Sequence, residues 1–248
     1  SSWTETKTEL SRSVRFEGVW ISPDSSDIFA VGYNGMILHS PDGAEWIVAE
    51  SGTDRNLYAI WGSSPSDIFA AGSGIILHFD GTEWMPAEIP VDETVKINAL
   101  WGNSGTDVFA VGYEGVILRY DGAEWKTTES GTDTHLYGVW GTSGTDVFAV
   151  GSFGTVLHYD GAEWTRMGHV PDVLFLEDVS GISGSDVFAV GYGGAVLHYD
   201  GSQWHRAETG TDISLNAVWI PPGIGTALDV FAAGDAGTIL RYTPSDSD

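Results

Sequence analysis

The sequence predicts an all-β fold, a six-bladed β-propeller made of four-stranded antiparallel blades. A motif of about 40 residues recurs along the chain, and repeats of this length built from short strands are typical of propellers. The 248 residues include 33 glycines and 11 tryptophans, which suits many short strands joined by tight turns. The six copies begin at Trp20, Trp61, Trp101, Trp140, Ser180 and Trp219.

Each copy divides into four expected strands. Examples from different copies are residues 57–61, 107–112, 116–120 and 125–128, all rich in β-branched and aromatic residues. Between the third and fourth strands stands an Asp-Gly pair, a strong signal for a hairpin turn that needs positive φ. These pairs begin at Asp42, Asp80, Asp121, Asp160 and Asp200. The blades are therefore expected to start near residues 16, 57, 97, 136, 176 and 215, within one domain spanning 1–248, with an acidic tail at 243–248.

The two ends of the chain predict how the propeller closes. The last copy stops after its third strand, at residues 240–242. Trp3 aligns with the tryptophans that open the fourth strands, namely Trp46, Trp84, Trp125, Trp164 and Trp204. Residues near 3–8 are therefore expected to complete the sixth blade, which would satisfy two otherwise open sheet edges.

The composition excludes several classes of function. A formal net charge of −25, from 35 acidic and 10 basic residues, disfavours binding to nucleic acid or to anionic lipid. The absence of cysteine excludes disulfides and thiolate metal sites. No apolar stretch is long enough to span a membrane. Such an acidic, lysine-poor chain is expected outside the cell or at its surface, with the periplasm as an alternative.

The hairpin Ser40-Pro41-Asp42-Gly43-Ala44-Glu45-Trp46 resembles the Asp-box of BNR-type and sialidase-like propellers, although it is one residue shorter between Asp and Trp. The whole repeat also resembles YCF48-like propellers and uncharacterised secreted bacterial propellers. Both resemblances imply a propeller fold, and the Asp-box implies a folding element. The YCF48-like proteins rely on basic surface patches that this acidic chain lacks, so their role is not carried over.

One charged position recurs in every blade and is interpreted as scaffold. The third strands carry His39, His78, Arg119, His158, His198 and Arg241, and the second strands begin near Asp27, Asp67, Asp107, Asp146, Asp186 and Asp229. A charge-assisted hydrogen bond within each Asp–His or Asp–Arg pair would pin the hairpin. Because the pair repeats, it is a poor candidate for catalysis, and no catalytic residue is assigned.

Function is expected where the blades differ, on the face that gathers the blade-linking loops and the turns between second and third strands. Its candidate ligand-binding residues are Tyr33, Tyr113, Phe153, Tyr192, Arg55 and His135. The first strands add Glu17, Tyr58, Tyr137, Glu177 and Asp178 near the channel mouth. Exposed aromatic rings beside acidic groups suit peptides or carbohydrates. Calcium on Glu17, Glu177 and Asp178 is a weaker alternative to a site without any cofactor.

The favoured function is a non-enzymatic binding or scaffold propeller that recognises a protein, peptide or glycan through this loop face. Two alternatives stay open: a glycan-active hydrolase or lyase with carboxylates at the channel mouth, and a multivalent lectin. Equivalent sites in all blades would favour the lectin, whereas the varied linking loops favour one asymmetric site. The chain is expected to be a monomer or a module of a larger assembly.

Overall fold

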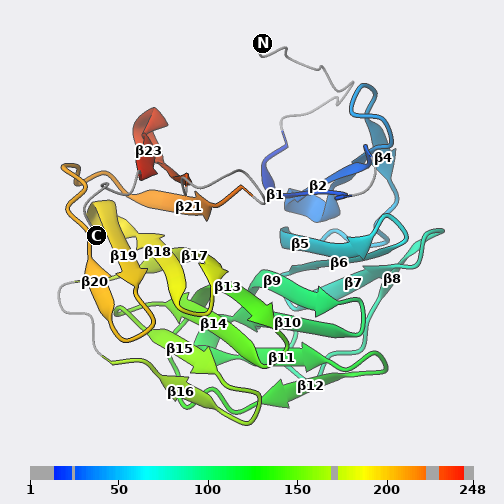
Figure 1. Cartoon of the computed structure of the whole chain (residues 1–248). Helices are drawn as coiled ribbons and strands as arrows, with labels where there is room; N and C mark the ends of the chain where they lie inside the picture. Colours follow the sequence, from blue (N-terminus) through cyan, green and yellow to red (C-terminus); the bar gives the residue numbers. More distant parts are fainter. Residues whose placement is uncertain (1–13, 24–25, 169–172, 222–228, 243–248) are drawn as a thin grey trace. The chain divides into compact units, whose positions relative to one another are not determined.

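The computed structural model describes residues 14–23, 26–168, 173–221 and 229–242, and within these ranges the chain forms six antiparallel sheets (Figure 1). Five sheets have four strands and the last has three. The chain divides into two compact units, the first comprising residues 1–110 with 118–127 and the second residues 111–117 with 128–248. Packing is described within each unit.

The strands follow one another in the order of the repeat. The first three sheets contain β1 Phe16–Ile21, β2 Ile28–Gly32, β3 Ile37–Ser40 and β4 Ile47–Ala49; β5 Leu57–Ser64, β6 Asp67–Gly72, β7 Ile75–Phe79 and β8 Trp84–Pro86; and β9 Ile97–Ser104, β10 Asp107–Gly112, β11 Ile117–Tyr120 and β12 Trp125–Thr128. The last three contain β13 Leu136–Ser143, β14 Asp146–Gly151, β15 Val156–Tyr159 and β16 Trp164–Arg166; β17 Leu176–Ser183, β18 Asp186–Gly191, β19 Ala195–Tyr199 and β20 Trp204–Arg206; and β21 Leu215–Trp219, β22 Val230–Gly234 and β23 Ile239–Tyr242.

The second strands of the four middle sheets, β6, β10, β14 and β18, lie in the core. They read as continuous apolar runs because their side chains are buried on both faces, unlike the alternating pattern of a half-exposed strand. Phe29, Phe69 and Phe148 are each at most 1% exposed. The first strands of neighbouring sheets pack a glycine against a tryptophan: a Cβ on Gly102 would lie 2.4 Å from the ring of Trp61 in the preceding sheet. The glycine of the repeated Trp-Gly pair therefore leaves room for a tryptophan ring from the preceding copy.

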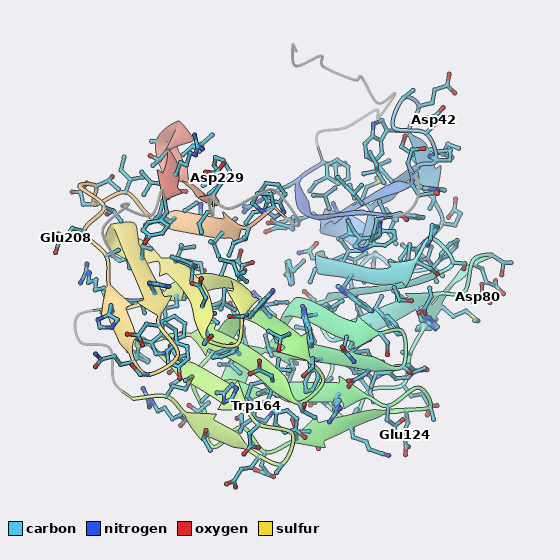
Figure 2. All side chains as sticks on the ribbon, viewed as in Figure 1. Asp42, Asp80, Glu124, Trp164, Glu208 and Asp229 are labelled. Carbon is cyan, nitrogen blue, oxygen red and sulfur yellow. The ribbon has the colours of Figure 1, made fainter. Side chains whose placement is uncertain are left out.

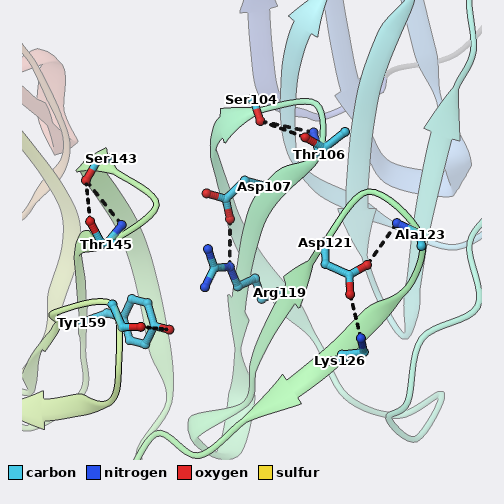
Figure 3. Close-up of polar contacts among 11 residues, drawn as sticks. Ser104, Thr106, Asp107, Arg119, Asp121, Ala123, Lys126, Ser143, Thr145 and Tyr159 are labelled. Carbon is cyan, nitrogen blue, oxygen red and sulfur yellow. Dashed lines mark hydrogen bonds and ion pairs between the residues drawn. The ribbon is translucent and has the colours of Figure 1, made fainter.

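The predicted Asp–His and Asp–Arg pairs are confirmed in all six sheets. The four histidine Nε2 atoms lie 2.7 Å from their aspartates, and Arg119 and Arg241 donate through Nε at 2.8 Å. Figure 3 shows the Asp107–Arg119 pair. Each ring or guanidinium also lies over the strand-two phenylalanine, at 4.0 Å for His39 on Phe29 and 4.9 Å for Arg119 over Phe109. Histidine and arginine can replace each other here because both are planar donors that stack on an aromatic face.

Removing one of these aspartates should destabilise the fold. The Asp146→Ala variant loses hydrogen bonds from His158 and Thr142 and leaves the half-buried His158 without its acceptor, so we expect the free energy of unfolding to fall by about 1–3 kcal/mol. Urea denaturation measures this change, with Asp212→Ala, at an exposed position, as the control. Unchanged stability would contradict the scaffold role.

The Asp-Gly pairs form the predicted turns. In each, the aspartate Oδ1 accepts N–H bonds from the residues two and three positions later, and the following glycine has positive φ between 75° and 96°. Two such turns contain Asp42 and Asp80, and Asp121 additionally binds Lys126 (Figures 2 and 3). These hydrogen bonds favour the carboxylate, and with the Thr82 hydroxyl they lower the pKa of Asp80 to about 2.

Closure of the propeller by the N-terminal strand stays a prediction. The last sheet ends at its third strand, and Trp3 with residues 3–8 lies outside the described residues, as does the tail 243–248. The described part of the chain contains no helix with the length and apolar character needed to span a bilayer.

Candidate functional site

Within each unit, the turns between second and third strands lie beside the linking segments. In the first unit Ser73 pairs with Lys96, and in the second unit Ser152 pairs with Phe175, each through a backbone bridge. We call this side of a unit the loop face. Short helical turns η1 Tyr33–Gly35, η2 Tyr113–Gly115, η3 Tyr192–Gly194 and η4 Asp235–Gly237 lie on it.

The loop face of the second unit carries a connected series of rings. Tyr113 stacks on His135 at 4.1 Å between ring centroids, His135 meets Tyr137 at 6.4 Å, Tyr137 meets Phe175 at 6.4 Å, and Phe175 meets Tyr192 at 6.2 Å. We call these five residues the aromatic track. Three of the sheets contribute to it, so residues 79 positions apart in the sequence, Tyr113 and Tyr192, share one surface.

Hydrogen bonds hold the track in place. The backbone N–H of Glu114 donates to His135 Nδ1 at 3.0 Å, which assigns the imidazole proton to Nε2. The Ser152 hydroxyl bonds the Tyr137 hydroxyl at 3.1 Å. His135 is half-buried and stacks on Tyr113. Rings fixed in this way lose little freedom when a partner binds.

Two strongly exposed apolar side chains flank the track. Phe153 is 63% exposed and Leu174 is 53% exposed, and the Phe153 N–H donates to the Leu174 carbonyl at 2.5 Å. Phe153 has a φ of 56°, a left-handed conformation that costs free energy for a bulky residue. An exposed ring kept in a strained turn is more readily explained by binding than by stability.

On the loop face of the first unit, the chain's own cations cover the rings. The Arg15 guanidinium lies 5.5 Å from the ring centre of Tyr33, and Lys96 Nζ lies 6.0 Å from that of Tyr58. Tyr58 also shares a hydrogen bond of 2.9 Å with Ser73. Covered rings of this kind are less available to a partner than the exposed Tyr192.

The side chain of Arg55, a candidate ligand-binding residue, forms hydrogen bonds with backbone carbonyl groups of the first unit. Its Nη1 donates to the carbonyl oxygens of Ser73 at 3.1 Å and Gly74 at 2.9 Å, and its Nη2 pairs with Glu93 at 2.5 Å. These contacts hold the turn at Ser73 and Gly74 against the linking segment that contains Glu93.

The three candidate carboxylates of the first strands have different environments. Glu17, in the first unit, is paired with Arg15 at 2.6 Å. Burial raises the pKa of Glu177, which has no hydrogen-bond or ion-pair partner among the described residues. Asp178 accepts N–H bonds from Val179 and Val218, both at 2.9 Å, and burial still raises its pKa to about 6.

The calcium site on Glu17, Glu177 and Asp178 stays a prediction. In the parts that the structure describes, no three His, Asp or Glu side chains gather as a metal site. Asp178 already satisfies two backbone donors, so it offers a cation less than a free carboxylate would.

At the last sheet, an apolar cavity lies beside Tyr242, the residue whose counterparts in other sheets stack on a tryptophan. The aromatic residue ending each third strand stacks on the tryptophan opening the fourth, at 5.2–5.4 Å for Phe79–Trp84, Tyr120–Trp125, Tyr159–Trp164 and Tyr199–Trp204. Tyr242 is the corresponding residue of β23. Beside it, a cavity of about 170 Å³ is lined by apolar side chains that include Phe188, Val230 and Leu240.

The neighbouring sheet contributes Phe188 to the same cavity. The strand-two phenylalanine of one sheet meets the tryptophan of the next nearly edge-on, as in Phe29–Trp84, Phe69–Trp125 and Phe148–Trp204 at 5.7–6.4 Å. Phe188 occupies this position in β18 and contacts Tyr242 at 5.5 Å. No tryptophan of the described residues lines the cavity.

Sequence comparison finds no match among models of protein families, and no curated protein matches the chain. Solved structures do resemble it. The WD40 β-propeller domain of Doa1 matches with a TM-score of 0.79 at 10% identity, over 98% of this chain and 83% of that one. YCF48 from Cyanidioschyzon merolae matches with a TM-score of 0.71 at 14% identity, over 97% and 85%. YCF48 bound to D1 peptide matches with a TM-score of 0.68 at 16% identity, over 97% and 81%.

These likenesses show the fold, an all-β propeller, and agree with the resemblance of the repeat to YCF48-like propellers. Of the candidate residues, the structure joins Tyr113, His135, Tyr137 and Tyr192 into one surface. Sequence reasoning gave no separate weight to Leu174 and Phe175. A difference between copies could have identified Phe175. It stands two residues before Glu177, and at the corresponding position of the first copy Arg15 stands two residues before Glu17.

Proposed function

We propose that this chain is a binding module that recognises a protein or peptide through the loop face of its second unit. The observation that carries the proposal is the aromatic track with its exposed flank, Phe153 and Leu174. Rigid aromatic rings that combine apolar area with polar edges are the residues that most often anchor protein partners. One of the similar structures, YCF48, is bound to D1 peptide.

The differences between copies favour one asymmetric surface over a lectin with equivalent sites. The turn after the second strand begins with Tyr33, Tyr113 and Tyr192 in the odd-numbered copies. It begins with Ser73, Ser152 and Asp235 in the even-numbered copies. A glycan partner stays a second candidate only because the same rings can stack on sugars.

The proposal predicts that the exposed flank can be removed without harm to the fold but with loss of binding. The Phe153→Gly, Leu174→Ser double variant deletes both apolar side chains, and glycine relieves the left-handed strain at residue 153. We expect peptides selected on the full chain from a phage-displayed random library to bind this variant roughly tenfold more weakly. Fluorescence anisotropy measures the affinities, and thermal unfolding should show equal or higher stability.

A matched control lies near the far end of β17, the strand that follows Leu174. Ile182 is 40% exposed near the end of β17, and Ile182→Ser removes a similar apolar area away from the loop face. The selected peptides should bind this variant as they bind the natural chain. The proposal fails if no peptide is selected, or if the loop-face variant and the control bind equally.

We further propose that residues 3–8 supply the missing fourth strand of the last sheet. Trp3 then fills the cavity beside Phe188 and Tyr242, as Trp204 does in the preceding sheet. The support is the size, apolar lining and repeat position of the cavity. In the preceding sheet Tyr199 pairs with Trp204 and His198 with His205, and the same register in the proposed strand would set Trp3 opposite Tyr242 and Thr4 opposite Arg241.

A further inference from the structure

At three corresponding positions, the first and fifth copies of the repeat share a glutamate and a tyrosine and differ at the third residue. In the first copy, Arg15 lies between a carboxylate and a ring: its Nε is 2.6 Å from Glu17, and its guanidinium carbon is 5.5 Å from the centre of Tyr33. The backbone links the same positions, since the Tyr33 N–H donates to the Arg15 carbonyl at 2.9 Å. The protein therefore shows how this site holds a guanidinium.

The fifth copy has the glutamate and the tyrosine at the corresponding positions, but a phenylalanine in place of the arginine. Glu177 corresponds to Glu17, Tyr192 to Tyr33, and Phe175 to Arg15. The backbone link is preserved, with the Tyr192 N–H donating to the Phe175 carbonyl at 3.0 Å. Tyr192 is 55% exposed, and the half-buried Glu177 has neither a hydrogen-bond nor an ion-pair partner within the described residues.

The neighbouring strand completes the surroundings of Glu177. A Cβ on Gly138 would lie 2.9 Å from the Cα of Asp178, so β13 and β17 run side by side at this level. Tyr137 and Glu177, each one residue earlier, therefore flank each other at the loop face, and the Tyr137 ring meets Phe175 at 6.4 Å. The loop face therefore carries both a carboxylate, Glu177, and the connected rings of Tyr137, Phe175 and Tyr192, and carboxylate and aromatic rings are the groups that bind a cationic side chain.

Within the described part of the second unit, no lysine or arginine forms an ion pair with Glu177. The second unit contains no lysine, and its arginines are Arg166, Arg206 and Arg241. Arg241 is paired with Asp229 at 2.8 Å. Arg166 and Arg206 end the outermost strands β16 and β20 of their sheets.

We infer that Glu177, Tyr137, Phe175 and Tyr192 form a pocket for a cationic side chain, arginine above all, supplied by the partner. The inference rests on the proposed function and names the chemistry of the partner. The net charge of −25 draws a basic segment toward the chain, and the pocket gives one of its side chains a fixed seat. Arginine fits best because its planar group can bind a carboxylate and stack on a ring together, as Arg15 does.

The test uses the full chain and the blocked pentapeptide Gly-Gly-Arg-Gly-Gly, with its citrulline counterpart as the neutral probe of equal shape. NMR titration should show shifts of the aromatic resonances of Tyr137, Phe175 and Tyr192 with the arginine peptide only. The Glu177→Gln variant should weaken binding roughly tenfold. The Glu17→Gln variant changes the net charge equally at the corresponding position and should leave the affinity unchanged.

A second variant introduces into the fifth copy the arginine that the first copy has at the corresponding position. Phe175→Arg places a guanidinium beside Glu177 and Tyr192, so it should block the arginine peptide while keeping the thermal stability at or above that of the natural chain. Equal shifts from both probes would show binding that does not depend on the cation, and equal losses in the Glu177 and Glu17 variants would show attraction by net charge alone; either result would overturn the inference. Phage-selected peptides that lose affinity in the Phe153→Gly, Leu174→Ser variant but not on replacing their arginines by citrulline would overturn it too, while the proposed function stands.

Discussion

Replacing Trp3 by alanine is expected to lower the free energy of unfolding by about 3–5 kcal/mol, the usual cost of removing a buried tryptophan. The reason is that, under the proposed closure, Trp3 fills the cavity of about 170 Å³ beside Phe188 and Tyr242. Urea denaturation measures the change. Trp204→Ala, at the corresponding position of the preceding sheet, should cost a similar amount, whereas Ser2→Ala, one residue before the expected strand, should change stability by less than about 0.5 kcal/mol.

A disulfide checks the same strand without removing its anchor. The chain has no cysteine, so the Thr4→Cys, Arg241→Cys variant can form only one intramolecular bond. In the register of β19 and β20 these residues face each other, and oxidation should raise the thermal midpoint. Ser11→Cys with Arg241→Cys, beyond the expected strand, should form no such bond. A harmless Trp3→Ala variant, or a disulfide that forms only between chains, would contradict closure within one chain.

Raising the pH from about 4 to about 7 should destabilise the natural chain by about 3 kcal/mol relative to its Asp178→Ala variant. Burial raises the pKa of Asp178 from its ordinary 3.8 to about 6, although the N–H groups of Val218 and Val179 favour the carboxylate. Between these pH values the folded chain keeps the proton that the unfolded chain releases. The stability contributed by the protonated group is therefore complete below pH 4 and is lost as the pH rises through 6.

The alanine variant is a fair reference because the corresponding position is alanine or glycine in other copies, as at Ala59 and Gly138. Urea denaturation at several pH values gives both curves, and their difference cancels the contributions of all other carboxylates. One of these, Asp80, acts with the opposite sign: its lowered pKa means that its stabilisation is lost as the pH falls toward 2. Parallel curves for the natural chain and the Asp178→Ala variant would contradict the prediction.

The strands, the Asp-Gly turns and the Asp–His or Asp–Arg pairs could be predicted from the sequence. Strand periodicity and turn chemistry are local properties, and the repeat shows them in several copies. Even the pairing of Asp146 with His158 follows from the repeat, because both belong to one hairpin whose short turn fixes the register. The sequence also singled out Tyr113, His135, Tyr137 and Tyr192 as candidates.

Only the tertiary structure decided which of these candidates act together. Tyr113 and Tyr192 belong to different sheets, and the rings between them connect through contacts across sheets that no local pattern encodes. The structure likewise committed Arg55 to backbone carbonyls and left Glu177 without a partner among the described residues. The physical reason is that strand and turn follow from neighbours along the chain, whereas a binding surface depends on the path of each loop and on how packing orients its side chains.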